Sequence, residues 1–266
     1  AVLGAYVLID RGVKPEQRGA IALGCLAIVA SALGYRTMLR NSDYANPIRL
    51  WEKNVAARPD HARPHLLLAM LYDRAGRMAD AGGQYEAAVA ANPTYFKGLL
   101  NLGGWHFRQG SFEIAATHFA RAAEVEPNNA AGYVQRGRVL LETGETKFAY
   151  ESLEKGLELE PTNPTAIRAL AWLLSTSPHT AERDGKRAMK LLKPLPADPA
   201  QQDVWRLDVL AAAQAETNDF QQAATTIGIA IERAAAQNRP AALQEQLQAR
   251  LKGYEQQQPW RLTKSD

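Results

Sequence analysis

The chain has 266 residues, of which 46% are hydrophobic and 22% are charged, a composition typical of a folded protein rather than a disordered one. Its formal net charge of +3 is too small an excess of Lys and Arg to indicate nucleic-acid binding. The single cysteine, Cys25, excludes an intrachain disulfide and a cysteine-based zinc cluster. Alanine is abundant and β-branched runs are few, which favours an all-helical fold.

The first residues of the chain differ from the rest. Residues 1–9 are apolar, residues 10–18 carry several charges, and residues 19–35 then run without any charged side chain. As an α-helix this last run spans roughly 26 Å, the short end of the transmembrane range. We therefore expect a transmembrane helix over residues 19–36 that contacts the lipid bilayer. Residues 1–18 would then be the end of a preceding span and its loop, which points to a piece of a longer membrane protein.

Two further interpretations of this apolar run remain open. One is a signal peptide, but the run starts far from residue 1 and no clear cleavage site follows it. The second is a buried helix of a soluble core, but the run has no polar face at any helical period. Positive charges flank the run almost equally on both sides, so the charge rule does not decide its orientation.

The remainder of the chain is an internal repeat. Four prolines, Pro59, Pro93, Pro127 and Pro161, follow one another at intervals of 34 residues. Small residues recur at 69, 103 and 137 and at 81, 115 and 149, and large apolar residues recur at 85, 119 and 153. This pattern predicts paired antiparallel helices in which a small side chain on one helix admits a large one from the other. Glycines at 76, 110 and 144 suit the tight turn within each pair.

The repeat extends in weaker form on both sides. We expect residues 42–161 to hold a half repeat, with its helix at Pro47–Ala57, followed by three regular units. Residues 162–254 are expected to form degenerate units and a polar capping helix, in which Asn218 replaces the turn glycine because Asn tolerates the left-handed conformation. Residues 255–266 are expected to be a frayed tail.

In spacing and residue type these units strongly resemble the tetratricopeptide repeat (TPR) family over residues 62–161. The resemblance implies an all-α TPR solenoid, a right-handed superhelix of helical hairpins. Residues 35–52, 170–189 and 207–223 further resemble the C-terminal repeat region of bacterial multi-span membrane TPR proteins related to the transmembrane-and-TPR O-mannosyltransferases. That resemblance implies a bacterial inner-membrane location, extracytoplasmic (periplasmic) repeats and a glycosyltransferase-like membrane half upstream.

Few residues suggest chemistry. His61 and His65 have the spacing of two metal ligands on one helix face, but Pro64 lies between them and His65 occupies a core position of the repeat. Ser177 and His179 lie too close together, in a proline-containing turn, for a catalytic triad. No phosphate loop or metalloprotease motif occurs. We therefore predict a non-enzymatic fragment with no catalytic residue, no cofactor and no metal site.

The predicted functional surface is a groove along the first helix of each repeat. Its apolar positions suit a protein or peptide ligand, and its scattered cations would suit an acidic one. Only Asn101 matches the asparagine ladder of some peptide-binding relatives, so a regular clamp on the peptide backbone is not expected. The candidate groove residues are Arg63, Leu66, Met70, Lys97, Leu100, Asn101, Phe107, Arg138, Arg168 and Trp172.

The favoured function is therefore a membrane-anchored scaffold that binds peptides or proteins through this groove. A rival function is that of the non-catalytic C-terminal portion of a membrane glycosyltransferase, O-mannosyltransferase-like, that positions the acceptor. If the transmembrane helix has the opposite orientation and the repeats lie in the cytoplasm, the chain would instead be a cytoplasmic assembly scaffold. The groove could also be a solvated face with no ligand.

Overall fold

The computed structural model describes residues 15–193 and 204–262, and within these ranges the chain is helical with no β-strand. The first helix, α2 (Pro15–Ala45), extends further than the sequence predicted in both directions. Residues 1–14 of the predicted preceding span and loop lie outside the described residues, whereas residues 15–18 form the first turn of α2. The chain divides into two compact units, residues 1–84 and 85–266.

The first unit contains α2, α3 (Pro47–Ala57) and α4 (Ala62–Arg74), and α5 (Met78–Ala91) spans the boundary between the units. Helix α3 has the predicted bounds because Pro47 suits the first helical position and the Asn46 side chain accepts a hydrogen bond from the Arg49 N–H. The Tyr72 hydroxyl on α4 donates to a Glu52 carboxylate oxygen on α3 at 2.7 Å, which joins the two helices.

Residues Gly19–Met38 of α2 form the long apolar stretch of the first unit, with a mean hydropathy of 1.6 and none of its length buried. By length and composition it could cross a membrane, although a signal sequence can have the same composition. Leu23, Ile28 and Met38 are each about two-thirds exposed or more, so the rest of the first unit leaves these side chains uncovered.

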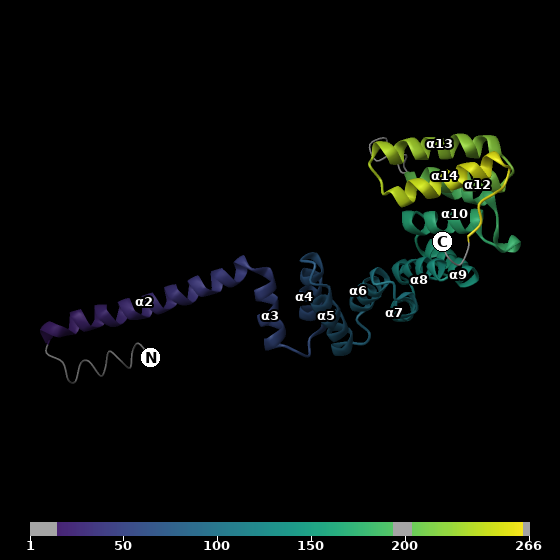
Figure 1. Cartoon of the computed structure of the whole chain (residues 1–266). Helices are drawn as coiled ribbons and strands as arrows, with labels where there is room; N and C mark the ends of the chain where they lie inside the picture. Colours follow the sequence, from purple (N-terminus) through teal and green to yellow (C-terminus); the bar gives the residue numbers. More distant parts are fainter. Residues whose placement is uncertain (1–14, 194–203, 263–266) are drawn as a thin grey trace. The chain divides into compact units, whose positions relative to one another are not determined.

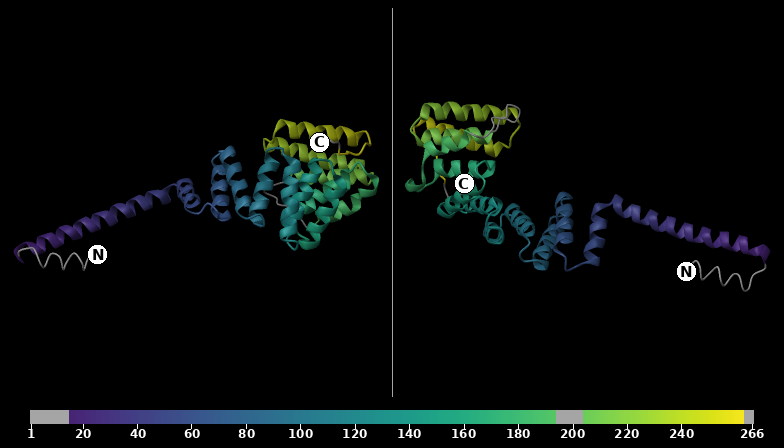
Figure 2. Two further views of the ribbon diagram at one scale, coloured as in Figure 1. Left: turned by 90° about the horizontal axis from the view of Figure 1, so that it is seen from below. Right: turned by 180° about the vertical axis from the view of Figure 1, so that it is seen from behind.

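The second unit is a succession of helical hairpins (Figure 1). The regular hairpins are α6 (Phe96–Arg108) with α7 (Phe112–Val125), and α8 (Ala130–Glu142) with α9 (Thr146–Leu159). Helix α10 (Pro164–Thr176) pairs with α11 (Gly185–Leu192) after an insertion that contains the 3-10 turn η1 (Thr180–Glu182). The last hairpin, α12 (Val204–Glu216) and α13 (Phe220–Ala236), is covered by α14 (Ala241–Glu255), and these helices lie side by side in both views of Figure 2. The predicted all-α solenoid is confirmed.

Each regular hairpin is held by a small residue facing a large one, as the sequence predicted. A Cβ atom added at Gly103 on α6 would lie 2.8 Å from a ring carbon of Phe119 on α7. A Cβ at Gly137 on α8 would lie 2.6 Å from the Cγ of Leu153 on α9. Phe119 and Leu153 are almost completely buried. The helices can approach this closely only because the facing position has no side chain.

The turns within the hairpins are also as expected. Gly76, Gly110 and Gly144 have φ angles of 74°, 75° and 75°, in the left-handed region that favours glycine. Asn218 adopts φ 63° at the same place in the α12–α13 hairpin, which confirms its predicted role.

The C-terminal part contains contacts that the repeat pattern did not predict. Asp208 on α12 and Arg250 on α14 form a buried ion pair, with both side chains less than a tenth exposed. The expectation of a frayed tail is wrong for residues 257–262, because the Leu262 N–H donates to the Thr176 carbonyl at 2.8 Å. Residues 263–266 and the proline-rich segment 194–203 lie outside the described residues.

Candidate functional site

The first helices of successive hairpins in the second unit line two neighbouring hollows. The first, the α6–α8 hollow, has a volume of about 410 Å³. Its floor is apolar, since Leu100 and Phe107 pack partly against the buried Phe119. The complete lining is Leu100, Asn101, Gly104, Phe107, Arg108, Phe119, Ala131, Gln135 and Arg138.

The second, the α8–α12 hollow, has a volume of about 550 Å³ and continues from the first, because Arg138 lines both. Its walls are polar at the α8 side and aromatic at the α10 and α12 side. The lining residues are Arg138, Leu141, Glu142, Thr165, Arg168, Ala169, Trp172, Trp205 and Leu262. The two hollows together are called the groove below.

Two of the three groove cations, Arg138 and Arg168, lie near aromatic rings. The Arg138 guanidinium carbon is 5.4 Å from the Phe107 ring centroid, and one of its nitrogens donates to the Gln135 side-chain oxygen at 2.8 Å. The Arg168 guanidinium carbon is 5.4 Å from the Trp205 ring centroid. A cation this close to an aromatic ring gains cation–π stabilisation, and Arg168 Nε also donates to the Pro164 carbonyl at 3.3 Å.

The groove carries more positive than negative charge. Arg108, Arg138 and Arg168 face a single lining carboxylate, Glu142. Burial raises the pKa of the Glu142 carboxyl, an effect that the nearby Arg138 partly opposes. Three guanidinium groups and one carboxyl whose ionisation is disfavoured give the lining a net positive charge.

Six of the ten predicted groove residues line these hollows. Leu100, Asn101 and Phe107 lie in the α6–α8 hollow, Arg168 and Trp172 lie in the α8–α12 hollow, and Arg138 joins the two. The Asn101 amide donates to the Lys97 carbonyl at 2.7 Å, so it is used within its own helix.

The remaining four predicted residues are placed differently. Lys97 is exposed in the first turn of α6 and lines neither hollow. Arg63, Leu66 and Met70 lie on α4 in the first unit, where Arg63 is exposed and Met70 is partly buried. Leu66 is only 4% exposed, so it belongs to the core rather than to an open face.

Several lining residues are not among the ten candidates, and they include Arg108, Glu142, Trp205 and Leu262. Trp205 could have been found, because α12 is the first helix of its hairpin and should present the same face as α10. Leu262 could not, because it reaches the groove from outside the repeat pattern.

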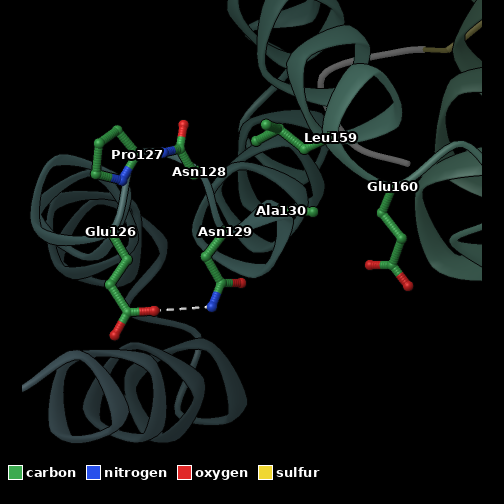
Figure 3. Close-up of a pocket in the computed structure, with 7 residues that line it drawn as sticks. All are labelled: Glu126, Pro127, Asn128, Asn129, Ala130, Leu159 and Glu160. Carbon is green, nitrogen blue, oxygen red and sulfur yellow. Dashed lines mark hydrogen bonds between the residues drawn. The ribbon is translucent and has the colours of Figure 1, made fainter.

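A third hollow lies at the connections between hairpins rather than along the first helices (Figure 3). It has a volume of about 590 Å³ and is bordered by residues 126–130 together with Leu159 and Glu160. Within it the Asn129 side-chain amide donates to the Glu126 carboxylate at 2.9 Å, and the Asn129 oxygen caps α8. These polar groups are used in ending one helix and starting the next, so the groove is the better candidate site.

The residues considered for chemistry have structural partners. The two ring nitrogens of His65 lie 2.8 Å from the Gln84 side-chain oxygen and from the Pro59 carbonyl. The Ser177 hydroxyl donates to a Glu182 carboxylate oxygen at 2.6 Å, which shapes the turn before α11. Across residues 15–193 and 204–262, no group of three or more His, Cys, Asp or Glu side chains is placed to hold a metal ion.

Comparison with known proteins addresses the fold. A family model described as tetratricopeptide repeat matches residues 36–96 and 106–164. The chain resembles the solved structure of PilF from Pseudomonas aeruginosa with a TM-score of 0.60 and 22% identity, covering 82% of this chain and 94% of that one. It resembles YrrB, a TPR protein with an unusual peptide-binding site, with a TM-score of 0.54 and 17% identity, covering 68% and 91%. No curated protein matches the sequence. With the 34-residue spacing and the hairpins described above, these likenesses show that the repeats have the fold of tetratricopeptide proteins.

Proposed function

We propose that the chain is a non-catalytic, membrane-anchored scaffold that binds an extended acidic peptide in the groove between α6 and α12. The observation that carries the proposal is the composition of the lining: three arginines lie among Leu100, Phe107 and Trp172 in two hollows that share Arg138. Apolar floors hold alternate side chains of an extended peptide, and oriented guanidinium groups bind carboxylates between them.

The placement of Arg138 supports this function. Because it borders both hollows, one guanidinium can contact a peptide carboxylate at the middle of the groove, with an apolar side chain seated on either side. Its stacking on Phe107 holds the guanidinium in place before a ligand arrives, which lowers the entropy lost on binding. YrrB has an unusual peptide-binding site of its own, and this supports a similar use of the fold here.

The test uses the full chain in mild detergent and a fluorescently labelled peptide of alternating acidic and apolar residues. A matched peptide carries Gln and Asn in place of Glu and Asp. We expect Arg138→Glu to weaken binding of the acidic peptide about tenfold or more and to leave the amide peptide nearly unchanged. Phe107→Ala should weaken both peptides, because it removes the apolar floor. Arg239→Glu, at an exposed position in the turn before α14, is the matched charge control.

Binding should also weaken as salt concentration rises, since the guanidinium–carboxylate contacts are screened. Equal affinity of the Arg138→Glu and Arg239→Glu variants for the acidic peptide would refute the groove as the binding site.

Membrane anchoring by α2 is part of the proposal. Its support is the uncovered apolar stretch Gly19–Met38. We expect the expressed chain to sediment with membranes and to resist extraction by alkaline carbonate, whereas Leu26→Arg with Ile28→Arg should release it. If the unaltered chain is freely soluble in carbonate, the anchor is refuted.

The proposal places the repeats on the extracytoplasmic side of the inner membrane, and its support is the resemblance of the sequence to the bacterial membrane TPR proteins. A C-terminal alkaline phosphatase fusion, active only outside the cytoplasm, should be active in a bacterial host. An inactive phosphatase fusion, with a fluorescent cytoplasmic reporter at the same position, would instead establish a cytoplasmic scaffold.

The same resemblance, in residues 170–189 and 207–223, supports a second candidate function: positioning an acceptor polypeptide for a membrane glycosyltransferase of the O-mannosyltransferase type. In that case the groove is still a peptide site, and the distinguishing result is glycosylation of the bound polypeptide in membranes that contain the chain. If glycosylation is the same in membranes that lack the chain, this second function is refuted.

A further inference from the structure

The end of the described chain folds back across the last hairpins. Helix α14 ends near Glu255, and Gln257 then adopts φ 56°, which turns the chain away from the helix axis. The Gln258 N–H donates to the Gly253 carbonyl at 2.8 Å and so closes this turn. From there the chain passes to α10, as the yellow end of the ribbon in Figure 1 shows. We name residues 257–262 the strap.

Three kinds of contact hold the strap. The Leu262 N–H donates to the Thr176 carbonyl at the end of α10 at 2.8 Å. The Arg261 guanidinium pairs with the Glu216 carboxylate of α12 at 2.5 Å. The Trp260 ring lies 5.1 Å from the guanidinium carbon of Arg250. A main-chain hydrogen bond, a charged anchor and an aromatic anchor are the contacts by which a groove holds a separate extended peptide.

The strap also forms part of the groove. Leu262 lines the α8–α12 hollow beside Trp172 and Trp205. The Arg250 guanidinium that contacts Trp260 lies over Trp172 as well, with its carbon 4.8 Å from that ring centroid. The strap therefore occupies the C-terminal end of the surface where the proposed peptide binds.

The contacts between the strap and the helices beneath it leave some polar atoms without hydrogen bonds. Four buried polar atoms at this place make no hydrogen bond: Trp260 Nε1, the Tyr254 hydroxyl, Arg250 Nε and Asp208 Oδ1. Tyr254, Arg250 and Asp208 are all more than nine-tenths buried. A buried polar atom without a partner loses the hydrogen bonds it made in water, so it weakens the net grip of the contacts around it.

We propose that the strap is a built-in ligand of the groove, which closes its C-terminal end and competes with any peptide that binds there. This inference rests on the proposed function, because it names the regulation of the same groove. The occupant is residues 257–262 of this chain. Peptide binding then requires the strap to leave, and whatever holds or releases the strap sets the affinity of the groove.

The probe for the experiment is a labelled synthetic peptide with the sequence of residues 257–266, and the protein is the full chain in mild detergent. The strap is weakened by the double substitution Arg261→Ala and Leu262→Ala, which removes the charged anchor and the apolar contact. We expect the probe to bind this variant at least tenfold more tightly than the unaltered chain. Lys252→Ala, at an exposed position of α14, is the control and should bind as the unaltered chain does.

A third variant tests the residue that Arg261 of the strap contacts. Adding Glu216→Gln to the double variant removes the partner of Arg261 in the probe and should weaken probe binding at least fivefold. Equal probe affinity of the unaltered chain and the double variant would overturn the proposal, as would binding that ignores Glu216→Gln.

Hydrogen exchange on the unaltered chain provides evidence that does not depend on how the variants fold. The Leu262 amide should be protected, and an excess of unlabelled probe should speed its exchange. If excess probe leaves that exchange unchanged, the proposal fails.

The two proposals can fail separately. If acidic peptides bind no form of the chain while the probe binds the double variant, the strap proposal stands and the acidic-peptide function is refuted. If acidic peptides bind the double variant and the unaltered chain equally, the peptide function stands and the strap does not compete.

Discussion

Gly137→Ala tests the packing of a small residue on α8 against a large residue on α9 within one hairpin. The added Cβ would lie 2.6 Å from Leu153 Cγ, 2.9 Å from Leu153 Cδ2 and 3.2 Å from the Ala149 carbonyl oxygen. Leu153 is fully buried and the carbonyl belongs to the backbone of α9, so the two helices must separate. Overpacking of this kind destabilises by about 1–3 kcal/mol, and the greater helix propensity of Ala offsets about 1 kcal/mol. With such close contacts we expect a net loss of about 2 kcal/mol.

Gly228→Ala is the matched control, because Gly228 lies inside α13 and an added Cβ there meets nothing within 4 Å. Here only helix propensity acts, so we expect a gain of about 1 kcal/mol. Urea unfolding of the full chain in mild detergent, followed by circular dichroism in the far ultraviolet, measures both. Hydrogen exchange localises the effect, which should be strongest in α8 and α9. A stabilising Gly137→Ala would refute the argument.

A double-mutant cycle isolates the contact. Leu153→Ala alone should destabilise by about 2–5 kcal/mol because it leaves a cavity. In the Gly137→Ala background the same change also relieves the clash, so the combined loss should be at least ~1 kcal/mol less than the sum of the two single losses. Additive losses would mean that the two side chains do not meet.

Three further predictions concern different parts of the second unit. Asn218→Ala should destabilise the protein by about 1 kcal/mol and Asn218→Gly should not, because φ is 63° at this residue. The midpoints of urea unfolding of the two variants measure the difference. Equal midpoints would contradict the argument that this turn needs a positive φ. Burial lowers the pKa of His118, which stacks on His106, from 6.5 to about 4. The unfolded chain therefore binds more protons between these values, and stability should fall by about 1–2 kcal/mol as pH drops from 6.5 to 4, after allowance for partial exposure. The pH dependence should shrink in His118→Gln, and an unchanged dependence would remove His118 as its source. Asp208→Ala should destabilise by about 3–5 kcal/mol because it leaves the Arg250 charge buried and unpaired, whereas joint replacement by Asp208→Leu and Arg250→Met should lose less, as thermal unfolding would report.

The regular hairpins could be predicted because each signal is local and repeated. The glycines at 76, 110 and 144 mark turns that need a positive φ, and the prolines 34 residues apart mark the connections between hairpins. The face of α8 that carries Arg138 follows from the same spacing. That is why Leu100, Phe107 and Arg138, which line the hollows, could be placed on the first helices from the sequence.

The features that sequence reasoning missed depend on contacts between distant residues. The Asp208–Arg250 pair joins positions 42 residues apart, and the Leu262–Thr176 hydrogen bond joins positions still further apart. Nothing in the local sequence around Arg261 or Leu262 has a helical period, so the pattern there is typical of a free tail. The burial of Leu66 was missed because an apolar residue near a helix start fits an open face and a core equally well.

The uniform turns give the chain a property that globular folds lack. The φ angle is nearly the same at Gly110 and Gly144, and the packing of Gly103 against Phe119 is repeated by Gly137 against Leu153. One hairpin can therefore replace another in the solenoid. A duplicated 34-residue repeat inserted at residue 127 would pack against hairpins of the same type on both sides. The length of the interaction surface can thus evolve by whole modules, while the specialised ends of the chain stay untouched.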